Sequence, residues 1–144
     1  MAWLDVDTRE SAETKRKFEA LGELHKDLDV SFKALNPGDF EWEHGIVEHK
    51  ELDDLVSSFI NQSEEYHRLE SQIERLKLVD KSIVQFLIVG ENYKDIYSNV
   101  HPHAVNGQIA KLTCLGFDVV MMDSYNPWED YIYRLVRMSA KYLD

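Results

Sequence analysis

The segment spanning residues 37–54 constrains the fold more than any other part of this 144-residue chain. Two short runs with the pattern of β-strands, 39–43 and 46–50, flank a turn at His44-Gly45. Glycine at this place permits the positive φ that a tight hairpin needs. We therefore expect a β-hairpin here, followed by a helix that begins at about Glu51.

Three side chains of this hairpin suit one kind of chemistry. Asp39 starts the first strand, and Glu48 and Lys50 lie two residues apart on the second, where alternation directs both to one face. Carboxylate oxygens bind a hard cation such as Mg²⁺, which activates water, and the ammonium stabilises negative charge on a phosphate. The hypothesis is a metal-dependent nuclease site. The alternative is a polar hairpin whose acids are merely solvated.

Length and composition are those of one globular domain with a core of its own. Apolar residues make up 44% and charged residues 30% of the chain, and no stretch is long and apolar enough to span a membrane. The N-terminus lacks the pattern of a signal peptide, and the single cysteine, Cys114, excludes an intrachain disulfide. We expect an intracellular protein, in the cytoplasm or nucleus, with Cys114 as a small core residue.

The formal net charge of −11 bears on the partners of the chain. It argues against broad electrostatic adhesion to nucleic acid, which relies on lysine and arginine. It does not exclude a nuclease, because a bound metal reverses the local sign of an acidic site. Weak or partner-dependent DNA binding is therefore expected.

Strand and helix patterns alternate along the chain and predict an α/β fold with a central mixed sheet flanked by helices. Besides the hairpin, strands are expected at 3–8, 28–35, 82–89 and 117–122. Helices are expected at 10–22, from 51 to about 60, and at 63–78, 103–115 and 126–142. The first helix has Thr8 or Ser11 as its cap and Gly22 as its end, and Pro127 suits the first position of the last helix. Residues 92–101 are expected to form a loop or a short helix.

The central motif resembles that of a known family. Gly38-Asp39, then Glu48-His49-Lys50, then Asp54 resembles the GD…ERKxxxD motif of the XPF-type nucleases of the PD-(D/E)xK superfamily. Four further segments extend the resemblance: Asp7-Thr8-Arg9-Glu10, the run Arg68-Leu69, Gln72 and Arg75-Leu76, the strand end 88–91, and the helix 105–112. By these motifs the chain is identified as a minimal, stand-alone XPF-type nuclease domain, archaeal or viral in type.

The resemblance implies a restriction-endonuclease-like fold and an endonuclease that uses Mg²⁺ or Mn²⁺. The implied substrate is DNA near branch points, such as flaps, forks or junctions, in repair, recombination or replication. Two other interpretations stay open. One is a non-catalytic subunit that dimerises with an active nuclease or scaffolds repair proteins, and the other is a general, restriction-like nuclease.

The resemblance also assigns roles to residues. Three acids would bind the metal: Asp7, Asp39 and Glu48. Lys50 would position the nucleophile, Arg9 would contact the phosphate, and Asp54 would hold the site or the metal's waters. In the alternative interpretation, these residues have purely structural roles. Asp7 and Arg9 then form an ion pair at a strand end, and Asp54 is an ordinary acid in the first turn of a helix.

The chain departs from the family pattern in three ways, one of which is its strongly acidic net charge. His49 replaces the arginine of ERK, and alternation turns it away from Glu48 and Lys50, so a different contact is expected there. The chain ends about where the nuclease domain should, so no helix-hairpin-helix module is expected.

Family members dimerise through the last two helices, which predicts a homodimer. The apolar residues of these helices are Val105, Ile109, Leu112, Ile132, Leu135 and Val136.

Overall fold

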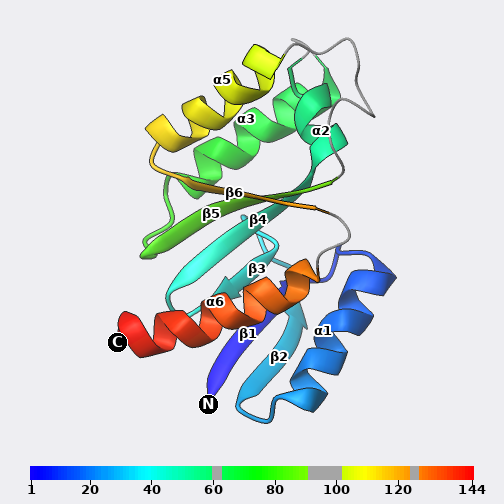
Figure 1. Cartoon of the computed structure of the whole chain (residues 1–144), viewed down its shortest axis with the longest axis vertical. Coiled ribbons are helices and arrows are strands. Elements are labelled where there is room, and N and C mark those ends of the chain that lie inside the picture. Colours follow the sequence, from blue (N-terminus) through cyan, green and yellow to red (C-terminus); the bar gives the residue numbers. More distant parts are fainter. Residues whose placement is uncertain (60–62, 91–101, 124–126) are drawn as a thin grey trace.

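The computed structural model describes residues 1–59, 63–90, 102–123 and 127–144. Its centre is a six-stranded sheet in the order β2-β1-β3-β4-β5-β6, with helices on both faces (Figure 1). The strands are β1 (Ala2–Asp7), β2 (Leu28–Lys33), β3 (Phe40–Trp42), β4 (Gly45–Glu51), β5 (Ile83–Val89) and β6 (Asp118–Met122). The helices are α1 (Ala12–Leu24), α2 (Leu52–Ser57), α3 (Glu64–Leu76), α5 (Pro102–Cys114) and α6 (Trp128–Tyr142).

The sheet is mixed, as the sequence predicts. β3 runs antiparallel to both of its neighbours, β1 and β4, whereas β1 pairs with β2, β4 with β5, and β5 with β6 in parallel. The predicted α/β class with helices on both faces is therefore confirmed. Within the described residues, no helix is long and apolar enough to cross a membrane.

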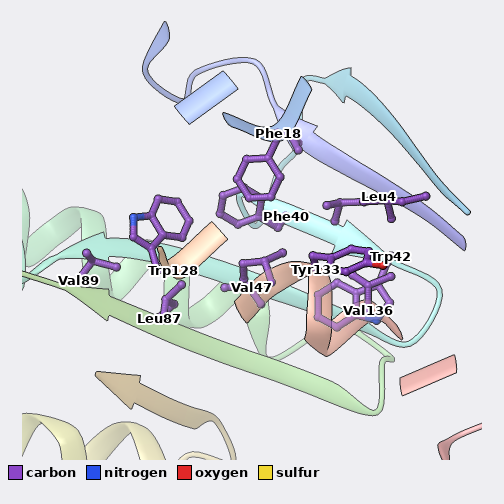
Figure 2. Close-up of a cluster of buried hydrophobic side chains, with 13 residues drawn as sticks. Leu4, Phe18, Phe40, Trp42, Val47, Leu87, Val89, Trp128, Tyr133 and Val136 are labelled. Atoms are coloured by element: carbon purple, nitrogen blue, oxygen red, sulfur yellow. The ribbon is translucent and has the colours of Figure 1, made fainter. Parts of the chain in front are cut away.

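Two hydrophobic clusters cover the two faces of the sheet. One joins α1 and α6 to the sheet, and its aromatic side chains Phe18, Phe40 and Trp128 lie together (Figure 2). The other joins α2, α3 and α5 to the opposite face. On β4, Val47 belongs to the first cluster and Ile46 to the second. Even-numbered residues of β4 therefore face α3, and odd-numbered residues face α6.

The hairpin forms, but the role expected for Gly45 is wrong. The turn falls at Glu43-His44, and Gly45 is the first residue of β4 and has no positive φ. A Cβ at this position would lie 2.5 Å from Cζ2 of Trp42 and 3.0 Å from Cβ of Ile83. Glycine is thus required for close packing under the Trp42 ring.

A positive φ occurs instead just before the first acid of the motif. Gly38 has φ 93° and follows a cis Asn36-Pro37 bond. A Cβ on Gly38 would lie 2.5 Å from two side-chain carbons of Ile46. Glycine is therefore required directly before Asp39 for two reasons: the backbone has a positive φ, and a side chain would clash with Ile46.

Several helix details differ from the sequence prediction. α1 begins after Ser11, whose Oγ accepts from the Thr14 amide at 3.1 Å, and it continues through Gly22. A Cβ on Gly22 would lie 3.2 Å from Cγ2 of Val30, so this glycine allows close approach of helix and strand.

At the C-terminal side, Pro127 is the N-cap of α6 rather than its first helical residue. Cys114 is exposed, which corrects the expected core position, because the buried stripe of α5 runs through Val105 and Leu112 instead. The segment expected at 92–101 lies outside the described residues.

Candidate active site

All six residues predicted for the active site line one cavity of about 550 Å³. They come from separate elements at one end of the central strands: Asp7 and Arg9 at the end of β1, Asp39 before β3, Glu48 and Lys50 on β4, and Asp54 in α2. The antiparallel step from β1 to β3 and on to β4 brings these elements together. The six predicted residues therefore surround one cavity, although ligand atoms of Asp7, Asp39 and Glu48 do not form a group within 4.8 Å of one another among the described residues.

The hairpin fixes the position of Asp39 against β4. The Asp39 amide donates to the Val47 carbonyl at 2.9 Å, and the Asp39 Oδ2 accepts from the His49 amide at 2.8 Å. Glu48 and Lys50 lie on the α3 face of β4, and each is only 5% exposed. Two carboxylates and an ammonium thus share a mostly buried site.

The two carboxyls of this site disfavour each other's ionisation. Burial, with the charge of Glu10, raises the pKa of Asp39 to about 6. Burial, with the charge of Asp39, raises the pKa of Glu48 to about 8, although Lys50 opposes that rise. The protein therefore concentrates negative charge where it is costly without a nearby cation.

Asp54 lies at the rim of the same cavity. Burial raises the pKa of Asp54, and the neighbouring charges of Asp53 and Glu65 add to the rise, while Lys50 lowers it. Asp54 is therefore part of the electrostatic field of the site as well as a first-turn residue of α2.

Asp7 and Arg9 form the ion pair that the purely structural interpretation of these residues predicts. The Arg9 Nε donates to Asp7 Oδ2 at 2.7 Å, and the Leu35 amide donates to Asp7 Oδ1 at 3.0 Å. Asp7 is 1% exposed, whereas the Arg9 side chain is 69% exposed. Asp7 thus anchors a guanidinium that remains accessible at the cavity.

The His49 side chain lies on the face of β4 opposite to Glu48 and Lys50, as alternation predicts. Its Nδ1 lies 3.2 Å from Glu10 Oε1, its Nε2 lies 3.1 Å from Glu51 Oε1, and its ring centroid lies 4.4 Å from that of Trp128. Burial opposes the charge on His49, but the hydrogen bond to Glu10 and the ion pair with Glu51 outweigh it and raise the pKa to about 10. The position of the motif arginine is therefore occupied by a charged side chain that ties the connection between β1 and α1, at Glu10, to β4.

Two further residues of the cavity have no role in the sequence analysis. Glu10 lines the cavity and acts electrostatically on both Asp39 and Glu48. Gln72 of α3 donates from Nε2 to Glu48 Oε1 at 2.8 Å. Both residues belong to segments that resemble the family, so the resemblance could have indicated them as site residues. No local sequence pattern, however, indicates which carboxylate of the cavity each of them would contact.

The donor set fits a hard divalent cation. Asp39 and Glu48 supply carboxylate oxygens whose mutual repulsion a cation would relieve, and such oxygens are the ligands that Mg²⁺ and Mn²⁺ prefer. Gln72 Oε1 is a buried atom of this cavity with no hydrogen-bond partner among the described residues. Unsatisfied acceptors beside paired acids are suited to a hydrated cation.

A second group of candidate metal ligands lies at the opposite end of β4. Oxygen and nitrogen atoms of Glu43, His44 and Asp144 lie within 4.8 Å of one another. His44 Nε2 is 2.6 Å from Asp144 Oδ1, and both acids are largely exposed. An ion pair at the surface accounts for this group.

The sequence matches the ERCC4 domain over residues 6–135. The chain belongs to the ERCC4 domain family. The matched range contains every residue of the candidate site, from Asp7 to Asp54, and confirms the resemblance to the XPF-type nuclease domain. A comparison with curated proteins gives no match.

Solved structures of similar fold agree with the family. XPF from Aeropyrum pernix superposes with a TM-score of 0.72 and 24% identity over 95% of this chain and 61% of that one. XPF from the same organism in complex with DNA gives a TM-score of 0.65 and 24% identity, over 98% of this chain and 66% of that one. This ERCC4 domain thus shares the fold of the XPF nuclease domain and spans less than two thirds of either relative.

Proposed function

We propose that this ERCC4 domain is a metal-dependent, structure-selective endonuclease that hydrolyses DNA phosphodiester bonds near flaps, forks or junctions. The observation that carries the proposal is the convergence of Asp39, Glu48 and Lys50 in one cavity. Paired acids next to a lysine are the chemistry that phosphodiester hydrolysis needs. The family supports this chemistry over other functions of an acidic cavity.

Asp39 and Glu48 would hold Mg²⁺ or Mn²⁺, with Asp7 as the third acid. When bound, the cation supplies an acidified water and neutralises charge on the scissile phosphate. The carboxyls of Asp39 and Glu48 must lose their protons to serve as ligands. Because their pKa values are raised to about 6 and about 8, we expect metal binding to be weak at low pH and to release protons.

The basic residues would act on the substrate. Lys50 lies beside Asp39 and Glu48 in the cavity, where its side chain can orient the attacking water or stabilise the negative charge that develops on the phosphate. Arg9, anchored by Asp7 and largely exposed, would contact a phosphate of the bound strand. Asp54 would hold the site through its proximity to Lys50.

The electrostatics of the whole chain favour weak substrate binding. The net charge of −11 repels DNA at long range, so affinity would come from the local arginines and lysines or from a partner protein. A DNA substrate would place the protein in the cytoplasm or nucleus. We expect cleavage to be sensitive to salt.

A homodimer through α5 and α6 is part of the proposal. α5 packs beside β6, which is an edge strand, whereas α6 packs on the opposite face of the sheet beside α1 and β1 (Figure 1). Four of the six apolar residues expected at the interface are buried within the single chain: Val105, Leu112, Ile132 and Val136. Ile109 and Leu135 are half-buried, and Met121 of β6 is 47% exposed, so they remain for a partner. The molecular mass in solution tests this.

The decisive experiment compares labelled flap, fork, four-way junction, single-stranded and linear duplex DNA, with Mg²⁺, Mn²⁺ or EDTA. Asp39→Asn should lower cleavage by at least about 100-fold because it removes a charged ligand. Asp29→Asn, an exposed acid on β2, is the matched control.

Metal-dependent cuts near the branch that Asp39→Asn abolishes would establish the proposed activity. Equal cutting of linear duplex would favour a general, restriction-like nuclease. No cutting with either metal by a folded protein would favour the alternative of a non-catalytic subunit that dimerises with an active nuclease.

A further inference from the structure

Gln72 joins α3 to the acidic pair of the candidate site. Its Nε2 donates to Glu48 Oε1 at 2.8 Å, across 24 residues of sequence. This side-chain contact links a helix to an acid of β4 in the cavity, and it constrains which way the Glu48 carboxylate points. An amide is suited to this task, since it donates to a carboxylate without adding charge.

The rest of α3 makes this contact rigid. Ser63 caps the helix by accepting from the Tyr66 amide at 3.0 Å, and Leu69, Ile73 and Leu76 are each 1% exposed. Gln72 lies on the adjoining stripe of the helix, which also lines the cavity. Its position therefore depends on a packed core rather than on a loop.

The other end of the Gln72 amide is unsatisfied. Oε1 is buried and has no hydrogen-bond partner within the described part of the chain, and the same is true of Oε2 of Glu65, about two turns earlier on the same face of α3. Both residues line the cavity that holds Asp39 and Glu48. A buried acceptor without a donor costs free energy, so such atoms are normally matched by water or a ligand.

We infer that Gln72 is a positioning residue of the metal site: its Nε2 orients Glu48, and its Oε1 accepts a hydrogen bond from a water of the cation's hydration shell. The inference rests on the proposed function, because it concerns the same site. It adds α3 to a site whose predicted residues come from β1, β4, α2 and the connections beside them. Mg²⁺ and Mn²⁺ keep several waters in protein sites, and an uncharged acceptor can hold such a water without competing for the cation.

The test measures metal binding in the absence of DNA. Titration calorimetry with Mn²⁺ at pH 8 should show that Gln72→Met, which keeps the side-chain volume, raises the Kd by about 10- to 100-fold. Ser71→Ala, an exposed neighbour on the same helix that is not part of the cavity, should leave the Kd unchanged. Urea denaturation with EDTA checks that Gln72→Met is folded.

Cleavage provides a second measurement that a purely structural role would not change. High Mn²⁺ should restore cleavage by Gln72→Met to near that of the unaltered protein, whereas Lys50→Met should stay inactive at any Mn²⁺ concentration. An unchanged Kd for Gln72→Met, or a cleavage defect that metal does not rescue, overturns the inference.

The two hypotheses fail in different ways. If Asp39→Asn abolishes Mn²⁺ binding but Gln72→Met binds as the unaltered protein does, only the role of Gln72 is wrong. If the unaltered protein binds no Mn²⁺, both the metal site and the role of Gln72 are refuted.

Discussion

Replacement of Glu48 by glutamine should stabilise the metal-free protein at alkaline pH. An unperturbed glutamate carboxyl titrates at 4.5, whereas the pKa of Glu48 is raised to about 8 in the folded protein. Between these values the folded state retains a proton that the unfolded state has released. The contribution of Glu48 to folding is therefore complete below pH 4.5 and is lost as pH rises through 8.

The magnitude follows from the size of the pKa rise. At about 1.4 kcal/mol per pKa unit, a rise from 4.5 to about 8 corresponds to about 5 kcal/mol. Glutamine carries no charge to bury or to be repelled by Asp39, so we expect Glu48→Gln to exceed the unaltered protein by about 3 to 5 kcal/mol in unfolding free energy at pH 8. The glutamine amide can keep the contact with Gln72.

Urea denaturation with EDTA at pH 5, 6, 7 and 8 measures this effect. The two proteins should be close in stability at pH 5 and diverge as pH rises. Glu74→Gln, whose side chain is 72% exposed on α3, should follow the unaltered protein throughout. Parallel pH profiles for the unaltered protein and Glu48→Gln, or a less stable Glu48→Gln at pH 8, would refute the electrostatic reasoning.

Three further outcomes are expected. Lys50→Met should lower cleavage by about 100-fold or more in a single-turnover assay while Mn²⁺ binding persists, because the charge acts on the phosphate; loss of binding would contradict this. Ser139→Ala should cost about 1 to 3 kcal/mol in urea, since the Trp42 Nε1 would lose its 2.8 Å acceptor. Gly45→Ala should cost at least about 2 kcal/mol, because its Cβ would meet the Trp42 ring at 2.5 Å; a stability equal to the unaltered protein would refute the packing argument.

The sequence predicted the sheet and the acidic cluster well because both depend on local alternation. Glu48 and Lys50 share a face because they are two residues apart on a strand, and His49 faces the other way for the same reason. Asp39 joins them because a hairpin is a local structure. These relations need no knowledge of distant packing.

The errors and omissions arise where distant segments meet. Gly45 was given a turn role, but its packing under Trp42 and Ile83 depends on the neighbouring strand β5. The contact of Gln72 with Glu48 depends on how α3 crosses the sheet. Cys114 was expected in the core because its run is apolar, yet only tertiary packing decides which face of α5 is covered.

The alternation along β4 has a consequence for evolution and engineering. One strand separates the two sides of the sheet, with Glu48 and Lys50 on the side of the acidic cavity and the side chains of Val47 and His49 packed on the side of α6. Displacement of this strand by a single residue would send the acids into the Trp128 cluster and the apolar side chains into the cavity. Insertions and deletions within the strand should therefore be fatal to folding and activity alike. Any change in the function of the cavity would therefore have to arise by substitution on the cavity face of β4, while the residues of the core face stay unchanged.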